Sequence, residues 1–387
     1  MGAQFGFNLL WTVALTYPLM TAIQSICARI GRVTGQGLAA NMAHMLPRWL
    51  VHVIVLLLFI ANVVNIGADL AAMGAAAGLV LGGAGHGTEV AFAVAFAVGS
   101  LLLQVFVPYH RYVHVLKWLT LSLLAYVGVL FTVAIDWGAV LRGILWPQLT
   151  ASRDVVVAVV AVFGTTISPY MFFWHSAEEV EDEVLSGAGA LLDHPQDAPV
   201  ELQRIAWDTW FGMGFSSIVS FFIVLTTAVT LHTAGITDIA TSADAAQALR
   251  PIAGNFAFLL FSLGIIGTGL LALPVLAGSA AYAIGELRGW RVGLEERPDN
   301  ARGFYGVIAL AFALGLLMLF LPIDPIKALF WSAVLNGLIA VPLMTATMIV
   351  VSSQAHLGAF VAPAMLRIVG WTATAVMAAA AVAMFAL

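Results

Sequence analysis

The chain has 387 residues, of which 62% are hydrophobic and only 9% are charged, with a net charge of −5. A soluble domain carries about a quarter of its residues as charged side chains, and so much exposed apolar surface would aggregate in water. The composition therefore excludes a soluble enzyme, a disordered chain and a nucleic-acid-binding protein, and it predicts a membrane protein. The single cysteine, Cys27, excludes an internal disulfide and a cysteine-based metal finger.

Apolar runs long enough to cross a bilayer recur along the whole chain. A spanning helix needs about 20 predominantly apolar residues. The candidate runs are 4–28, 50–82, 88–107, 113–135, 154–176, 205–231, 253–285, 303–321, 325–351 and 364–387. The connections between them are short and polar. We therefore expect an all-α polytopic protein with about ten spans, folded as a single transmembrane domain over 1–387.

Lysine and arginine fall mostly on one side of this arrangement. Loops that carry an excess of these residues are cytoplasmic. Of the fifteen, eleven follow the first, third, fifth, seventh and ninth runs: Arg29, Arg32, Arg48, Arg111, Lys117, Arg204, Arg288, Arg291, Arg297, Arg302 and Arg367. These loops are expected in the cytoplasm of a bacterium, with the spans in its inner membrane. Met1 is then outside, and either the first run inserts that way or one more helix precedes it.

The run 154–176 is interrupted near its middle. Ser168 and Pro169 are a second helix-start signal within the span, with Ser as N-cap and Pro at the first helical position. Pro169 also removes a backbone donor. We predict two half-helices joined by an unwound segment, Thr165–Ser168, with Asp154 capping the first half. Transporters use such breaks to coordinate cations. The alternative is a simple proline kink, which membrane helices tolerate.

The motif around this break resembles that of a known family. Gly164-Thr165-Thr166-Ile167-Ser168-Pro169-Tyr170, followed by His175-Ser176, is similar to the sixth-helix motif of the Nramp divalent-metal transporters. The usual form in that family is Gly-Ala-Thr-Val-Met-Pro-His, followed by a His-Ser pair. Residues 2–11 resemble the end of the first helix and the start of the second. Residues 24–35 resemble the exit of the second helix, and 68–71 resemble the third-helix motif Thr-Asp-Leu-Ala-Glu.

This resemblance implies the LeuT-type inverted-repeat fold of the APC superfamily. The ten runs then correspond to helices two to eleven. Residues 1–136 form an incomplete first repeat, 153–351 the second repeat, and 364–387 an extra helix. The first helix, with its Asp-Pro-Gly-Asn ion-binding motif, is expected to be missing from this sequence.

The resemblance also implies where a metal ion binds. The site is expected between helices one and six, with oxygen ligands from Thr165, Thr166 and Ser168. The helix that contains Asn336 contributes an amide to the site in the family. The alternative for Asn336 is an interhelical hydrogen bond, which is the common role of asparagine in an apolar helix.

Several positions depart from the family pattern. Ser168 stands where the family has methionine, and oxygen ligands favour hard ions such as Mg²⁺ or Mn²⁺ over softer metals. Tyr170 replaces histidine and Ala72 replaces glutamate, both on the proton route of the family, so weak or absent proton coupling is expected. Asp69 is the one acid left in its span. We therefore expect Asp69, Tyr170 and His175 along an ion or proton pathway, although Asp69 is alternatively a packing acid bonded to a neighbouring helix.

The sequence as a whole predicts a divalent-cation transporter that works by alternating access. It resembles the magnesium-type branch more than the iron and manganese carriers. The metal ion is then a substrate, so no cofactor and no enzymatic activity are expected, and the partners are the divalent cation and the lipid bilayer, without nucleic acid. The alternative is a non-transporting truncated homologue or assembly partner that lacks the first-helix half of the site. The oligomeric state stays open.

Overall fold

The protein is described by a computed structural model that covers residues 1–81, 85–107, 111, 114, 116, 118–147, 152–239, 241–321 and 324–387, without the side chain of Asn255. Within these residues the regular elements are helices, and none is a strand. Nine helical segments of this part of the chain are long and apolar enough to cross a membrane. The all-α class predicted from the composition is therefore confirmed.

The long helices follow the predicted runs closely. They are α2 (Leu10–Thr34), α4 (Arg48–Val80), α5 (His86–Phe106), α9 (Arg153–Thr166) with α10 (Pro169–Ser186), α11 (Ala198–Thr227), α14 (Ala257–Arg288), α15 (Arg302–Leu317), α16 (Pro325–Val351) and α18 (Ala364–Ala386). The π-helical turn Ala228–His232 extends α11. The predicted run 113–135 lies partly outside the described residues, and its described part contains the short apolar helix 120–129, which ends with α7 (Ala125–Val129).

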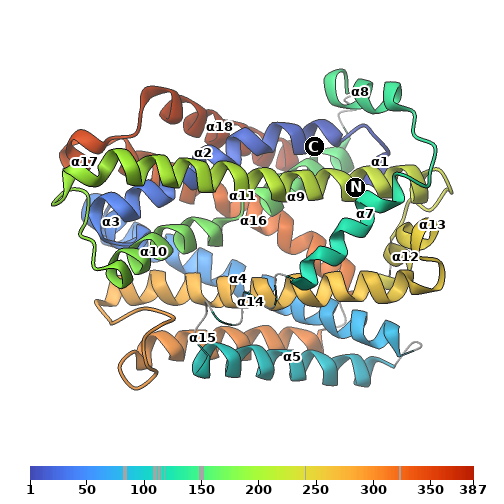
Figure 1. Cartoon of the computed structure of the whole chain (residues 1–387), viewed down its shortest axis with the longest axis horizontal. Coiled ribbons are helices and arrows are strands. Elements are labelled where there is room, and N and C mark those ends of the chain that lie inside the picture. Colours follow the sequence, from blue (N-terminus) through green and yellow to red (C-terminus); the bar gives the residue numbers. More distant parts are fainter. Residues whose placement is uncertain are drawn as a thin grey trace.

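Short helices cap the two ends of the bundle. They are α1 (Gly2–Phe5), α3 (Leu38–Met45), α8 (Trp137–Leu145), α12 (Ser242–Ala246), α13 (Arg250–Ala253) and α17 (Gln354–Leu357). Figure 1 shows α3 and α17 at one end, and α8, α12 and α13 at the other. The end with α3 and α17 also holds the arginines in the last turns of α2 and those of the connection after α14, and the positive-inside rule predicts that this end faces the cytoplasm. The sequence did not predict α8, where the Asp136 side chain accepts a hydrogen bond from Ala139 N at 3.0 Å.

Small residues set the closest helix contacts in the core. A Cβ atom on Gly164 of α9 would lie 2.0 Å from the Ala333 carbonyl oxygen and 2.4 Å from the Gly337 nitrogen, both on α16. A Cβ atom on Gly31 of α2 would lie 2.2 Å from the Ser176 carbonyl oxygen of α10. Small residues at such crossings let two backbones pack directly. The two halves of the broken span are therefore each fixed against a different neighbour, α9 against α16 and α10 against α2.

Candidate functional site

The predicted break in the fifth run is present but shorter than expected. Helix α9 ends at Thr166 and α10 begins at Pro169, so only Ile167 and Ser168 are outside helical geometry. Ile167 has φ −101° and ψ 62°, and Ser168 is extended with φ −78° and ψ 128°. The prediction that Thr165–Ser168 is unwound was therefore wrong for the two threonines, which complete the last turn of α9.

The caps of the two half-helices also differ from the prediction. Ser152, not Asp154, is the N-cap of α9, and its Oγ accepts a hydrogen bond from Val155 N at 3.4 Å. Ser168 does occupy the N-cap position of α10, with Pro169 directly after it. However, its side chain makes no capping hydrogen bond to α10.

The Ser168 hydroxyl points back to the first half-helix instead. Its Oγ donates to the carbonyl oxygens of Gly164 at 3.0 Å and Thr165 at 2.7 Å, and the residue is buried. The hydroxyl hydrogen is thus committed to the end of α9, whereas the oxygen lone pairs remain as acceptors. The negative end of the α9 dipole, which lies in its last carbonyl groups, is directed at the same place.

The two threonines of the motif differ in their surroundings. Thr166 is half-buried, and its Oγ1 donates to the Val162 carbonyl oxygen at 2.7 Å. Thr165 is exposed although it lies deep within the span, and its hydroxyl takes part in none of the hydrogen bonds found among the described residues. One face of the break is therefore not covered by the described helices.

Asp69 approaches this region from α4. It is half-buried, and no ion pair or hydrogen bond among the described residues involves its carboxyl group. Tyr170, in the first turn of α10, lies within electrostatic range of the Asp69 carboxyl group, and no hydrogen bond among the described residues joins the two side chains. Asp69 and Tyr170 therefore lie in the same region of the fold as Ser168, and among the described residues no hydrogen bond ties the Asp69 carboxyl group to a neighbouring helix.

Asn336 is held by a residue that the sequence interpretation missed. Asn65 Nδ2 on α4 donates to Asn336 Oδ1 on α16 at 2.8 Å, and Asn336 Nδ2 donates back to Asn65 Oδ1 at 3.0 Å. Both amides are buried. This reciprocal pair is the interhelical hydrogen bond that was the alternative for Asn336, and it leaves the second lone pair of each amide oxygen.

The amide pair connects the acid to the break. Asn65 precedes Asp69 by four residues and so lies on the same face of α4. Asn336 directly precedes Gly337, which packs against Gly164 of α9. The distance between Asp69 and the end of α9 therefore depends on this hydrogen-bonded crossing. An asparagine in an apolar run was the signal that could have identified Asn65.

His175 faces another part of the molecule. Its Nδ1 lies 3.3 Å from Gln24 Oε1 on α2, and it does not line the cavity beside α10. By contrast Tyr170, Ala177 and Glu181 follow each other at helical spacings of seven and four residues, so they share one face of α10. Tyr170 therefore lies on the same face of α10 as the cavity-lining residues Ala177 and Glu181, whereas His175 faces α2, and neither Tyr170 nor His175 lines the cavity itself.

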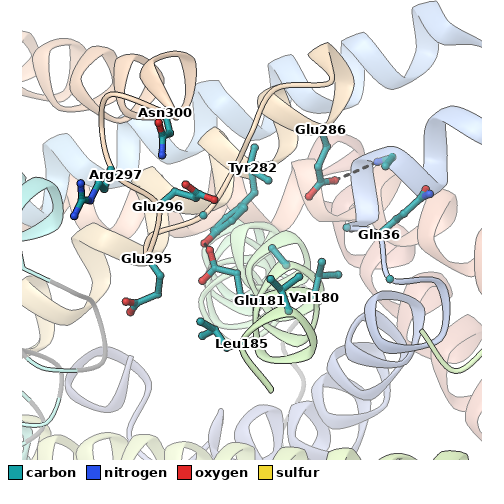
Figure 2. Close-up of a pocket in the computed structure, with 17 residues that line it drawn as sticks. Gln36, Val180, Glu181, Leu185, Tyr282, Glu286, Glu295, Glu296, Arg297 and Asn300 are labelled. Atoms are coloured by element: carbon teal, nitrogen blue, oxygen red, sulfur yellow. Dashed lines mark hydrogen bonds between the residues drawn. The ribbon is translucent and has the colours of Figure 1, made fainter. Parts of the chain in front are cut away.

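A cavity of about 510 Å³ opens at the end of this face that lies beside α3. Figure 2 shows Glu181 of α10 beside Tyr282 of α14, with Glu295 and Glu296 from the following loop and Glu286 further along α14. Glu181 Oε1 accepts from the Tyr282 hydroxyl at 2.6 Å and from Leu294 N at 2.8 Å. Glu286 Oε2 accepts from Ala40 N at 3.1 Å, in the first turn of α3. The wall is acidic, which favours cations over anions.

A separate set of charges ties α2, α10 and α11 together at the same end. Arg32 of α2 contacts Glu183 of α10 at 3.1 Å and Glu201 of α11 at 3.2 Å. Arg204 of α11 contacts Glu179 of α10 and, at 3.1 Å, Glu201. We refer to these five residues as the charge network. The sequence did not predict it, because its members are far apart along the chain.

No group of three or more His, Cys, Asp or Glu side chains in the described part of the chain is placed to hold a metal ion. A cation at the break would therefore rely mainly on backbone and hydroxyl oxygens, with the Asp69 carboxylate in electrostatic range of Tyr170. Such a ligand set is hard and neutral apart from one carboxylate.

Comparison with known proteins gives a consistent set of similarities. A model of the family described as natural resistance-associated macrophage protein-like matches residues 1–387. The divalent metal cation transporter MntH of Aeromonas hydrophila is 29% identical over 293 residues, and MntH of Yersinia pestis is 28% identical over 284 residues. Each match covers 71% of this chain and 64% of the relative, so the matched part spans less than two thirds of these relatives.

Solved structures show the same fold. A manganese transporter of Eremococcus coleocola, in complex with an aromatic bis-isothiourea substituted compound, superposes with a TM-score of 0.75 at 14% identity, and the match covers 98% of this chain and 80% of the transporter. The inward-facing conformation of Mhp1 superposes with a TM-score of 0.53 at 14% identity, and the match covers 98% of this chain and 84% of Mhp1. The predicted LeuT-type fold is confirmed by these neighbours.

Proposed function

The chain belongs to the natural resistance-associated macrophage protein (Nramp) family, and on this premise we propose that it carries divalent metal cations across a membrane by alternating access. The cation is the substrate, and no covalent chemistry is involved. The observation that carries the proposal is the break between α9 and α10, which presents oxygen atoms within an apolar span. Irregular backbone at such depth is tolerated only where it lines a cavity or is buried in protein.

The oxygen atoms at the break suit a cation. The last carbonyl groups of α9 carry the negative end of the helix dipole, and the Ser168 hydroxyl holds two of them in place through its hydrogen bonds to Gly164 and Thr165. The exposed Thr165 and half-buried Thr166 line the uncovered face. An ion at this face would bind these oxygens and keep part of its water shell.

Asp69 supplies the charge that neutral oxygens lack. Moving a divalent cation from water to an apolar environment is costly unless an opposite charge accompanies it. Asp69 has no partner among the described residues and lies close to Tyr170 at the break. An acid within a membrane span is a candidate functional group in its own right. We infer that Asp69 balances the charge of the bound ion.

The ligand set points to a hard ion. Serine at position 168 replaces the thioether that methionine would provide, and every other candidate ligand is an oxygen. Mg²⁺ gives up its water reluctantly and is usually bound with several waters retained, which the open face of the break allows. We therefore propose Mg²⁺ or Mn²⁺ as the transported ion, in the inner membrane of a bacterium.

Weak or absent proton coupling follows from the same residues. Ala72 on α4, one turn after Asp69, cannot bind a proton, and Tyr170 has replaced a histidine-type group next to the break. Of the candidate pathway residues, only Asp69 faces the break with an ionisable carboxyl group. A continuous proton route past the site would need a second titratable group beside it.

The acidic cavity beside α10 gives the ion a way to the cytoplasm. Tyr170 at the break and Glu181 in the cavity lie on one face of α10, eleven residues apart, which is about 16 Å along a helix axis. Carboxylates at a channel mouth raise the local concentration of cations. Movement of α10 relative to α9, hinged at Ile167 and Ser168, would open and close this route.

A second candidate function is that of a non-transporting assembly partner. The observation in its favour is the single carboxylate at the break, which leaves one positive charge of a divalent ion uncompensated. Such a protein would keep the fold and would not move cations.

Uptake into proteoliposomes separates the two candidates. We would reconstitute the purified chain and follow Mg²⁺ and Mn²⁺ entry with indicators trapped inside, with protein-free liposomes as the background. Transport predicts entry of both ions above background, and loss of entry in Asp69→Asn. The matched control is Asp154→Asn, an exposed acid in the first turn of α9. Entry at the background level with correctly folded protein would contradict transport and favour the assembly partner.

A further inference from the structure

A second cavity, open along much of its surface and of about 490 Å³, lies at the start of α18. Its wall is one face of α18, with Arg367, Trp371 and Thr372, and Ser352 at the end of α16 closes it on the other side. Ile368 and Ala375 make the rest of the wall apolar. The cavity therefore combines one cation and two hydroxyl groups with a hydrocarbon-like surface.

Arg367 has no counter-charge among the residues that the structure describes. Its Nε atom is buried and makes no hydrogen bond, and its guanidinium group forms no ion pair with the described residues. No Asp or Glu follows Asp324 in the chain, and Arg367 is the only charged side chain after Lys327. A buried donor without an acceptor is unfavourable, more so when it is charged.

The position of Arg367 in its helix adds to this imbalance. The residue is in the first turn of α18, where the helix dipole is positive. A cation is disfavoured there and an anion is favoured. An anionic group in the cavity would satisfy the orphan Nε atom, neutralise the arginine and face the positive end of α18.

We propose that this cavity binds the phosphate-containing headgroup of an anionic phospholipid from the cytoplasmic leaflet. Arg367 would bind the phosphate through its planar fork of donors, which matches phosphate geometry. The Ser352 and Thr372 hydroxyls would donate to the remaining headgroup oxygens. This lipid site does not depend on the proposed transport activity.

A lipid fits better than a free phosphate ion for two reasons. The cavity continues along the apolar face of α18 through Ile368 and Ala375, where an acyl chain can lie. Trp371 lines it, and tryptophan is enriched where a helix passes through the headgroup region. Basic pockets between helices at the cytoplasmic side of a membrane are known to bind anionic headgroups.

The test compares lipid retention by matched arginine variants. Purified protein in phosphatidylcholine nanodiscs would be titrated with phosphatidylglycerol, and retained lipid counted by native mass spectrometry. In Arg367→Gln we expect the apparent affinity for phosphatidylglycerol to fall about tenfold, as for the loss of a hydrogen bond to a charged group. The control is Arg48→Gln, which removes an exposed arginine from the same end of the molecule and should leave the affinity unchanged.

Two further measurements keep the proposal falsifiable. Arg367→Lys keeps the charge but loses the fork of donors, so its affinity should lie between those of the wild type and Arg367→Gln. Should Arg367→Gln fail to fold, the affinity of Arg367→Lys for phosphatidylglycerol, compared with that of the wild type, tests the proposal. Inorganic phosphate, added to detergent-solubilised protein, tests the free anion.

Several results would overturn the proposal. These are equal retention of phosphatidylglycerol by the wild type and Arg367→Gln, an equal loss in Arg48→Gln, or retention of phosphatidylcholine as strong as that of phosphatidylglycerol. Thermal stabilisation by inorganic phosphate equal to that by phosphatidylglycerol would assign the site to a free anion and contradict the lipid.

Discussion

The polar groups of the charge network are paired with one another, whereas those at the break between α9 and α10 are mostly left without partners among the described residues. In the charge network, two arginines on α2 and α11 contact three carboxylates on α10 and α11, and Arg32 is only 4% exposed. At the break, Asp69 has no partner among the described residues, and Thr165 is exposed within an apolar span. One region is internally satisfied, whereas the other is left with an acid and several oxygen atoms that nothing in the described structure neutralises.

This difference distinguishes polar groups that stabilise the fold from polar groups that are available to bind a ligand. Groups that satisfy each other hold helices together, and losing one of them leaves the rest uncompensated. Groups that remain unsatisfied reduce stability and are retained only where they serve a ligand. The charge network should therefore control stability, and the break should control ion binding. The predictions below test this division.

The largest expected effect is on stability, from Arg32→Gln. Removing this arginine leaves Glu183 and Glu201 without one of their cationic partners, and breaking a buried pair costs about 3–5 kcal/mol. Thermal unfolding in detergent would measure the loss. Arg48→Gln, at an exposed position, should change the stability by less than about 0.5 kcal/mol. Equal unfolding temperatures of Arg32→Gln and Arg48→Gln would mean that the charge network does not hold α2, α10 and α11 together.

The second effect is on transport, from Asp69→Asn. Loss of an interaction with a charged group costs about 1.5–3 kcal/mol, so we expect ion uptake at low concentration to fall about ten- to a hundredfold. The free energy of unfolding should stay the same or rise, because a half-buried, unpaired charge within an apolar span is removed. If Asp69→Asn kept its ion uptake while its free energy of unfolding fell, Asp69 would stabilise the fold instead of binding the ion. The proposed division between the break and the charge network would then be wrong.

The third effect is on selectivity, from Ser168→Met. A thioether at this position favours softer ions, so the ratio of Cd²⁺ to Mg²⁺ uptake should rise about tenfold, equivalent to about 1.4 kcal/mol. Ser168→Ala removes the hydroxyl without adding sulfur, and it controls for the lost hydrogen bonds to Gly164 and Thr165. A selectivity ratio unchanged in Ser168→Met would exclude this position as a selectivity ligand.

The fourth effect is the coupling between Asn65 and Asn336. Hydrogen bonds between transmembrane helices contribute about 0.6–1.7 kcal/mol in double-mutant cycles. A cycle of Asn65→Ala, Asn336→Ala and the double variant, measured by unfolding, should give a coupling in this range. The same variants should weaken ion uptake, because the pair fixes α4 against α16. Additive effects on both readouts would show that the amides act independently.

The smallest effect is a pH dependence at the α3–α17 contact. His356 Nε2 lies 2.6 Å from Asn41 Oδ1, and burial, followed by the nearby His44, lowers the pKa of His356 below its usual value of 6.5. The folded state then holds this proton less tightly than the unfolded state, so stability is lost as the pH falls below 6.5. His356→Gln should remove that part of the pH dependence, which unfolding at pH values on both sides of 6.5 would detect. An unchanged pH profile would show that His356 does not contribute.

Much of the fold could be predicted from composition and spacing. Apolar runs and their lengths identified the long helices, because a bilayer accepts few other structures. The run 113–135 and helix α8 were harder, since α8 is short and amphipathic and sits at the end of the bundle. Short surface helices depend on local capping, which one sequence reveals weakly.

The site was predictable in its position but not in its contacts. Ser168 and Pro169 identified the break because serine favours the N-cap and proline the first position of a helix, whatever the rest of the fold. The direction of the Ser168 hydroxyl was not predictable, since the carbonyl groups of the preceding turn, which accept from it, compete with the N–H groups of the next helix, which donate to it. Asn65 and the charge network were missed because their partners lie on other helices, and only the fold brings them together.

The most direct test of the central claim is to locate the ion. Diffraction data from crystals of the protein soaked in Mn²⁺ would show the metal by its anomalous scattering. We predict a peak at the break, within about 2.0–2.6 Å of oxygen atoms of Thr165, Thr166 or Ser168, as hard-ion coordination requires, and its loss in Asp69→Asn. A peak that survives in Asp69→Asn, or metal found only among the glutamates of the cavity beside α10, would contradict the account.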